Sequence, residues 1–216
     1  AVIVPIYNTE KYLRETIDSV ICQTLSFAEH IRLILLDDAS TDGSFAICEQ
    51  YQKQYPKQIV VKHYDTNQGV SALRNEGVRI AGEMGDELIT FLDSDDKLAD
   101  DAMEKAVQYF DAHEDVFVAA IGIRYFDAYE GEQRLNWRFE KTDVVDIKKD
   151  YTYPHYYVGG VFLRHAVLDE LHFDESLSFW EDALAVNQVI VSQGNDVSAK
   201  LQPFFQEINL TQINTI

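Results

Sequence analysis

Short apolar runs alternate with longer amphipathic stretches through the first half of the chain. The runs are rich in β-branched residues, which favours buried strands, and we expect strands at residues 1–5, 31–36, 59–63 and 88–92. The stretches between and after them repeat apolar residues every three or four positions. We expect a helix that Asn8 or Thr9 caps and that runs to residue 25, and further helices at residues 44–55, 70–81 and 100–113. Strands that alternate with helices favour a mostly parallel sheet with right-handed crossovers.

The pattern is weaker in the second half. Residues 116–125 and 158–163 predict strands, and residues 125–139 alternate weakly, as in a hairpin. Helices are expected at residues 164–171 and 183–193. The chain has no internal repeat and no low-complexity linker, and 216 residues suit one sizeable α/β domain better than two.

Charge restricts the partners that such a domain can have. The 37 acidic residues outnumber the 18 Lys and Arg residues, which gives a formal net charge of −19. So acidic a surface repels phosphate backbones, and we expect no nucleic-acid partner. A divalent cation held between carboxylates would still allow a diphosphate ligand to bind.

Cysteine usage and apolar run length indicate the setting. Cys22 and Cys48 both fall in expected helices, and two thiols favour a reduced cytoplasmic environment over a disulfide framework. The longest apolar runs, such as residues 116–123, are far below the ~20 residues of a membrane span. The chain has no initiator Met and Ala1 falls at the edge of a strand, so we expect a piece of a longer protein. Association with the inner face of the membrane would come from parts outside this chain.

Polar residues follow three of the expected strands at the point where each strand ends. Tyr7 follows the first, Asp37 and Asp38 follow the second, and the cluster of residues 93–96 (Asp-Ser-Asp-Asp) follows the fourth. Ligands of parallel sheets bind beyond these carboxyl ends. Clustered carboxylates repel one another unless a cation compensates, and hard oxygen ligands favour Mg²⁺ or Mn²⁺. Each acidic turn has a simpler alternative, as an Asx turn or the cap of the next helix.

Two further sites could carry chemistry. Arg74 follows a glycine turn and could direct its guanidinium at a diphosphate, although exposure on a helix is the commoner fate of an arginine. Glu181 and Asp182 follow an aromatic pair, where a carboxylate can act as a general base or simply favour a helix N-terminus. His155 could reach the site or merely pack at the surface. The chain has no dinucleotide-binding glycine motif, no P-loop, no nucleophile elbow and no zinc-ligand spacing.

Five segments, taken in order, resemble the inverting glycosyltransferases of family 2, which have the GT-A fold. The resemblance spans residues 2 to 191, with Leu73 where alanine is usual, and it rests on Val2–Asn8, Leu36–Ser44, Asn67–Gly77, Phe91–Asp96 and a late block of Phe173–Glu175 with Glu181-Asp182. It implies a three-layer α/β/α sandwich with a mostly parallel central sheet and a smaller antiparallel part on the acceptor side. Residues 1–98 would form the nucleotide-sugar-binding half of one catalytic domain, and residues 99–216 the acceptor-binding half.

The resemblance also implies roles for individual residues on the donor side. Pro5 and Tyr7 would line the nucleobase pocket, and Asp38 would accept a hydrogen bond from the base, which favours uracil. Arg74 would approach the base or the diphosphate. Asp93 would lie near the ribose and diphosphate, with Ser94 in the same nucleotide-binding set.

The metal and the base are implied in the same way. Asp95 would ligate Mn²⁺ or Mg²⁺ with Asp96 as a nearby helper and Asp93 in the same set. Asp182 would be the base that deprotonates the acceptor hydroxyl, and Glu181 is the second candidate. The segment at residues 158–161 would line the acceptor side.

The function implied is transfer of a hexosyl or N-acetylhexosaminyl group from a nucleotide diphosphate, favouring UDP, to a hydroxyl acceptor with inversion. The acceptor could be a cell-surface polysaccharide, a teichoic-acid-like polymer, a lipid-linked sugar or a protein. Two alternatives stay open. A nucleotidyltransferase would need a glycine-rich loop after the first strand, where the chain has residues 5–9 without glycine. A glycan- or partner-binding domain without turnover would not need its acidic motifs intact.

Overall fold

A computed structural model describes residues 1–126, 133–135, 144–145, 158–192 and 199–209. Its helices are α1 (Leu13–Ile21), α2 (Phe27–His30), α3 (Ser44–Gln54), α4 (Val70–Met84), α5 (Ala102–Ala112), the 3₁₀ helix η2 (His165–Glu170) and α6 (Glu181–Ser192). Its strands are β1 (Val2–Ile6), β2 (Leu33–Asp37), β3 (Ile59–His63), β4 (Leu88–Phe91), β5 (Lys97–Leu98), β6 (Val118–Phe126), β7 (Gln133–Leu135), β8 (Val144–Val145), β9 (Val161–Arg164) and β10 (Ala199–Asn209). No described helix is long and apolar enough to cross a bilayer.

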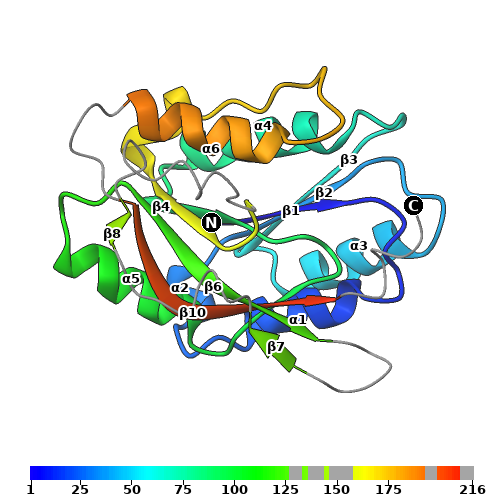
Figure 1. Cartoon of the computed structure of the whole chain (residues 1–216). Coiled ribbons are helices and arrows are strands. Elements are labelled where there is room, and N and C mark those ends of the chain that lie inside the picture. Colours follow the sequence, from blue (N-terminus) through cyan, green and yellow to red (C-terminus); the bar gives the residue numbers. More distant parts are fainter. Residues whose placement is uncertain (127–132, 136–143, 146–157, 193–198, 210–216) are drawn as a thin grey trace.

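The described strands form one mixed sheet in the order β3-β2-β1-β4-β9-β6-β10-β5 (Figure 1). Strands β3, β2, β1 and β4 are parallel, as the alternation in the first half predicts. Strand β9 is antiparallel to both of its neighbours, β4 and β6. The strands whose carboxyl ends hold the candidate polar residues, β1, β2 and β4, therefore all lie in the parallel half of the sheet. The antiparallel pairs of β9 lie in the other half.

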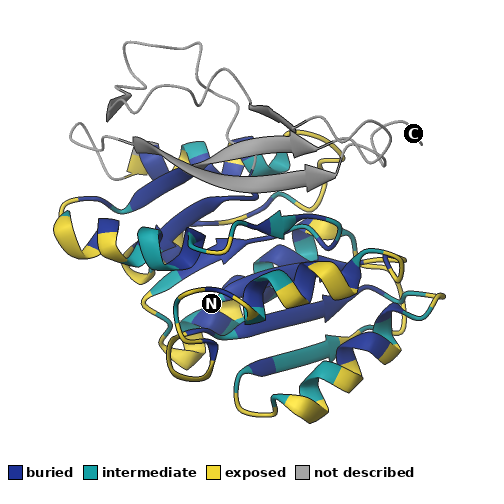
Figure 2. Cartoon of the chain, turned by 90° about the horizontal axis from the view of Figure 1, so that it is seen from below, coloured by how far each residue is buried: buried dark blue, intermediate teal, exposed yellow. Residues whose placement is uncertain are grey.

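Helices cover both faces of the sheet, which gives the expected three layers (Figure 1). On β1, the side chains of Val2 and Val4 enter the core beneath α1, α3 and α5, whereas Ile3 enters the core beneath α4 and α6. All five residues of β1 are buried, because a strand covered on both faces places every side chain in a core (Figure 2). The predicted fold class is confirmed.

The first helix differs from its prediction. It begins at Leu13 and ends at Ile21, so neither Asn8 nor Thr9 caps it, and Cys22 lies just past its end. Asn8 has a φ of 54° and its side chain accepts the backbone N–H of Thr41 at 2.8 Å. The capping side chain is therefore used to join two loops, and this tertiary contact overrides the local helix signal.

The second half contains two further differences. The expected helix at residues 164–171 is the 3₁₀ helix η2, and β10 lies where no element was expected. Pro203 interrupts the pattern of β10, and the pairing of β10 with β6 shifts register between Gln202 and Phe205. A proline within a strand is tolerated at such an irregularity, because the missing N–H is not needed there. The expected hairpin is present in part as the antiparallel pair β6–β7, and the rest of it lies outside the described residues. His155, a separate candidate site residue, also lies outside the described residues.

Candidate active site

A cavity of about 480 Å³ lies at the carboxyl ends of β1, β2 and β4. Its volume is within the range of small-molecule sites, and its position is the one that the sheet topology favours. The cavity brings together seven of the residues that the sequence singled out, and Thr9, Asn67, Gly69, Val70 and Leu73 also line it. The seven are Pro5, Tyr7, Asp38, Arg74, Asp93, Ser94 and Asp95.

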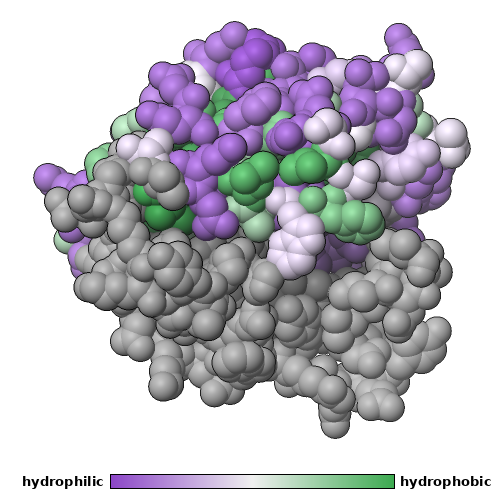
Figure 3. Space-filling model, turned by 45° about the horizontal axis from the view of Figure 1, so that its top comes forward, coloured by the Kyte–Doolittle hydropathy of each residue, from purple (hydrophilic) through white to green (hydrophobic). Residues whose placement is uncertain are grey.

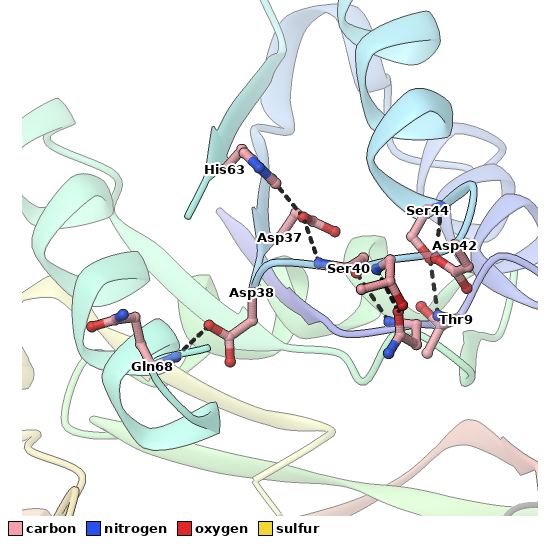
Figure 4. Close-up of polar contacts among 10 residues, drawn as sticks. Thr9, Asp37, Asp38, Ser40, Asp42, Ser44, His63 and Gln68 are labelled. Atoms are coloured by element: carbon pink, nitrogen blue, oxygen red, sulfur yellow. Dashed lines mark hydrogen bonds and ion pairs between the residues drawn. The ribbon is translucent and has the colours of Figure 1, made fainter. Parts of the chain in front are cut away.

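Asp38 is buried beside this cavity and holds the loop that precedes α4. Its Oδ1 accepts the backbone N–H of Gln68 at 2.6 Å (Figure 4). Its Oδ2 accepts the backbone N–H of Gly69 at 3.0 Å. Gly69 has a φ of 89°, a conformation that favours glycine. Each carboxylate oxygen can accept a second hydrogen bond, so Asp38 supports the loop and still has acceptor capacity toward the cavity.

Asp37 differs from its neighbour because successive side chains of a strand point to opposite faces. It is fully buried, its Oδ2 accepts the backbone N–H of Ser40, and the same oxygen lies 2.7 Å from His63 Nδ1 (Figure 4). The ring of Phe45 stacks on His63 with 4.2 Å between ring centroids. Asp37 therefore fixes the loop from within, and only Asp38 of this pair lines the cavity.

Two polar loops meet beside the cavity. The backbone N–H of Thr9 donates to Ser44 Oγ at 2.9 Å, and that of Asn8 donates to Ser40 Oγ at 3.0 Å (Figure 4). These hydrogen bonds from the loop after β2 hold the loop after β1 in place. They thereby fix the segment that contains Tyr7, whose side chain is half exposed at the cavity.

The acidic cluster divides into residues at the cavity and a residue behind it. Asp93 and Asp95 line the cavity, and burial together with the charge of Asp93 raises the pKa of Asp95 to about 6. Asp96 is 2% exposed, does not line the cavity, and donates its backbone N–H to the carbonyl of Asp93. Ser94 contributes its carbonyl oxygen, which accepts the hydroxyl of Thr16 at 2.9 Å.

The residues present fit a divalent cation that completes its coordination elsewhere. Within the described residues, no three His, Cys, Asp or Glu side chains are arranged to hold a metal ion. Asp93 and Asp95 supply two carboxylates whose mutual repulsion a cation would relieve. Mg²⁺ binds typically through one or two carboxylates and takes its other ligands from substrate phosphates and water.

Arg74 joins the cavity to the carboxylates at the start of α6. Its guanidinium is buried, with Nη1 2.9 Å from Glu181 Oε1 and Nη2 3.4 Å from Asp93 Oδ1. The ring of Phe173 lies against the guanidinium, 5.6 Å from its carbon to the ring centroid. The alternative of an exposed helix arginine is therefore wrong, because the side chain of Arg74 is 5% exposed and lies between two acidic groups.

Asp182 lies on the same first turn of α6 and has a different environment. Burial raises its pKa, opposed by a hydrogen bond from the Ala183 backbone N–H and by the positive charge of Arg74. Its Oδ2 also accepts the backbone N–H of Val158 at 3.4 Å. A buried carboxylate whose pKa is raised holds protons more readily, which is the property of a general base.

Sequence reasoning included Asn75 and Phe173 in its motif segments but gave neither residue a role in this arrangement. Asn75 donates to the carbonyl of Phe173 at 2.9 Å and accepts the backbone N–H of Phe173 at 2.8 Å. One amide side chain thereby holds Phe173 beneath Arg74 across 98 positions of sequence. Such pairing depends on the tertiary fold, so the two separate motif segments did not reveal it.

Comparison with known proteins shows the family to which the chain belongs. Residues 1–172 match the family described as "Glycosyl transferase family 2". The chain is 42% identical over 195 residues to the minor teichoic acid biosynthesis protein GgaA of Bacillus subtilis, covering 89% of this chain and 43% of that protein. The chain thus spans less than half the length of that relative.

Solved structures show the same fold. The S. aureus TarS fragment 1–349 in complex with UDP superposes with a TM-score of 0.78 at 24% identity, covering 97% of this chain and 60% of that one. The mannosyltransferase PcManGT from Pyrobaculum calidifontis, in complex with GDP-Man and Mn²⁺, gives 0.72 at 16% identity, covering 99% and 57%. Since the family match covers residues 1–172, which is most of the chain, the chain belongs to glycosyl transferase family 2.

Proposed function

We propose that this chain transfers a sugar from a UDP-sugar to a hydroxyl acceptor, with inversion and with the help of a divalent metal. One observation carries the proposal. The cavity lined by Asp38, Asp93 and Asp95 connects through Arg74 to the carboxylates Glu181 and Asp182. This connection supports a donor site and a base that lie close together, as inverting transfer needs.

The donor half of the site follows from the cavity lining. Tyr7 and Pro5 offer an aromatic and an apolar surface for the nucleobase, and Asp38 offers an acceptor for the N–H of uracil. Asp93, Asp95 and the bound diphosphate would hold Mn²⁺ or Mg²⁺, with Asp96 behind them. The metal supplies charge neutralisation on the departing diphosphate. Arg74 lies where a positive charge assists that neutralisation.

The acceptor half follows from the two carboxylates on α6. Glu181 is occupied by its ion pair with Arg74, whereas Asp182 accepts hydrogen bonds only from backbone groups in the contacts described. Asp182 is therefore the better base. It removes the proton of the acceptor hydroxyl as that oxygen attacks the anomeric carbon from the face opposite the diphosphate. A single displacement of this kind inverts the anomeric configuration.

The relatives suggest the kind of product. GgaA is named as a minor teichoic acid biosynthesis protein. We propose that this chain likewise modifies or builds a cell-surface polymer, acting at the cytoplasmic side. Residues 1–98 would bind the donor and residues 99–216 the acceptor.

Replacing Asp182 by Asn tests the assignment of the base. The variant keeps the size of the side chain but cannot accept the proton, so transfer should fall by about 10²- to 10⁴-fold. UDP affinity, measured by calorimetry with Mn²⁺ present, should stay unchanged, because Asp182 does not line the donor cavity. Hydrolysis of UDP-N-acetylglucosamine and UDP-glucose provides a readout when no acceptor is at hand. Turnover that survives the substitution would remove Asp182 from the mechanism.

A further inference from the structure

Two aromatic side chains stand exposed directly before the carboxylates of α6. Phe179 is 72% exposed and Trp180 is 62% exposed. Leu177 and Leu184, their neighbours in the chain, are also exposed. Figure 3 shows hydrophobic residues gathered across the middle of the face that carries α4 and α6. Large aromatic side chains contribute most to stability when buried, so two exposed in succession indicate a binding surface.

The backbone at Trp180 is held in a conformation that folding alone does not favour. Its φ is 67°, in the left-handed region that bulky residues rarely adopt. The carbonyl of Trp180 accepts the backbone N–H of Leu184 at 3.0 Å, so this conformation begins α6. A glycine would adopt it without strain. Strained residues of this kind cluster at ligand sites, so the position of Trp180 suggests a functional one.

The position of the pair indicates that function. Glu181, the next residue, contacts Arg74, and Arg74 lines the donor cavity. Phe179 and Trp180 themselves do not line that cavity. The two residues thus come just before Glu181 and Asp182 in the chain, next to the contact that joins α6 to the donor cavity.

We propose that Phe179 and Trp180 bind the sugar or polyol unit of the acceptor by stacking against its C–H face. The C–H bonds of a carbohydrate are slightly positive and pack on the negative face of an aromatic ring. Such contacts hold the reacting unit while its hydroxyl meets Asp182. The proposal rests on the proposed function and adds the surface that binds the acceptor.

Charge favours a carbohydrate over the other surfaces that aromatic side chains bind. With a net charge of −19, the chain has no overall attraction for a phosphate polymer or for an anionic membrane. Binding of an acceptor then has to come from neutral contacts. Stacking on the carbon skeleton provides these contacts whether or not the polymer carries phosphate.

Saturation-transfer NMR tests the proposal with defined probes. Methyl β-N-acetylglucosaminide, maltotriose and ribitol 5-phosphate are each added at about 10 mM, because a single stacked unit corresponds to millimolar affinity. UDP and Mg²⁺ are present. We expect at least one probe to receive saturation on its C–H protons, and we expect Trp180→Ala and Phe179→Ala each to weaken its binding about tenfold. Met84→Ala, at an exposed residue on the far end of α4, serves as the control and should leave binding unchanged.

Two measurements separate this proposal from its alternatives. Trp180→Gly should keep the melting temperature of the wild type or raise it, because it relieves the positive φ. A lowered melting temperature would make the ring structural and overturn the proposal. So would probes that receive no saturation, or vesicles of phosphatidylglycerol that bind the wild type but not Trp180→Ala. UDP calorimetry on the same samples distinguishes failure of this proposal from failure of the proposed function. If UDP does not bind, the proposed function itself is refuted.

Discussion

At the scale of single residues, the site places like charges together at a cost in stability. Asp93 and Asp95 line one cavity, and the repulsion of Asp93 adds to burial in raising the pKa of Asp95 to about 6. Arg74 compensates Asp93 and Glu181 but is buried between them, so its position depends on both. Residue types at the strand ends could be predicted from the sequence. The different directions of the Asp37 and Asp38 side chains could not be predicted from the sequence. A shift of one position reverses the face to which a side chain points, and the strand end is not known to that precision from the sequence.

Replacing Asp95 by Asn should stabilise the metal-free protein at neutral pH. The pKa of Asp95 is raised on folding from 3.8 to about 6, so the folded state binds the proton more tightly than the unfolded state. Stability is then lost as the pH rises from about 4 through about 6. Asn carries no charge and avoids this loss. Thermal unfolding in EDTA should show a higher melting temperature for the variant at pH 7.5.

The same comparison at low pH is the control. Below about pH 4 the wild-type carboxyl is protonated, and the two melting temperatures should coincide within the effect of the amide itself. A variant that is less stable than the wild type at pH 7.5 would contradict the claim that burial and repulsion by Asp93 destabilise the charged Asp95 side chain.

At the scale of elements, α4 connects the donor site to the rest of the molecule. It presents Arg74 to the cavity, binds Phe173 through Asn75, and packs Gly77 against Ile3 of β1. The sequence predicted the start of this helix and placed its end within three residues, because the apolar periodicity and the glycine turn before Val70 both indicate the same helix. The start of α1 and the strand β10 could not be predicted, since Asn8 bonds a distant loop and Pro203 masks the strand pattern.

Two glycines of α4 make a matched pair of substitutions. A Cβ at Gly77 would lie 2.3 Å from the Cγ2 of fully buried Ile3, whereas a Cβ at Gly82 would come no closer than 3.9 Å to Leu168. Gly77→Ala should therefore destabilise the fold by about 1–3 kcal/mol through overpacking. Gly82→Ala should stabilise it by about 0.5–1 kcal/mol, because alanine is the better helix former. Urea unfolding measures both, and a Gly77→Ala protein as stable as the wild type would refute the close packing of α4 on β1.

At the scale of the whole molecule, a parallel half that carries the cavity continues into a mixed half, in which β9 is antiparallel to its neighbours and β10 is parallel to β6. The alternation of strands and helices predicted the first half, together with the edge of the sheet at which the cavity lies. Pairing in the second half depends on contacts between distant strands such as β6 and β10, which no local period encodes. The acidic net charge disfavours a nucleic-acid partner and favours a cation wherever a diphosphate binds.

The central claim is that carboxylates at one edge of the sheet bind UDP through a shared metal ion, and thermal unfolding with UDP and Mn²⁺ tests it most directly. Since the described residues offer no complete metal cluster, Mn²⁺ alone and UDP alone should each change the melting temperature little. Together, at about 100 times the dissociation constant, they should add about 2.7 kcal/mol and raise the melting temperature by about 5–10 °C. Asp95→Ala and EDTA should each abolish that rise. A rise with UDP that persists unchanged in EDTA and in Asp95→Ala would contradict the account.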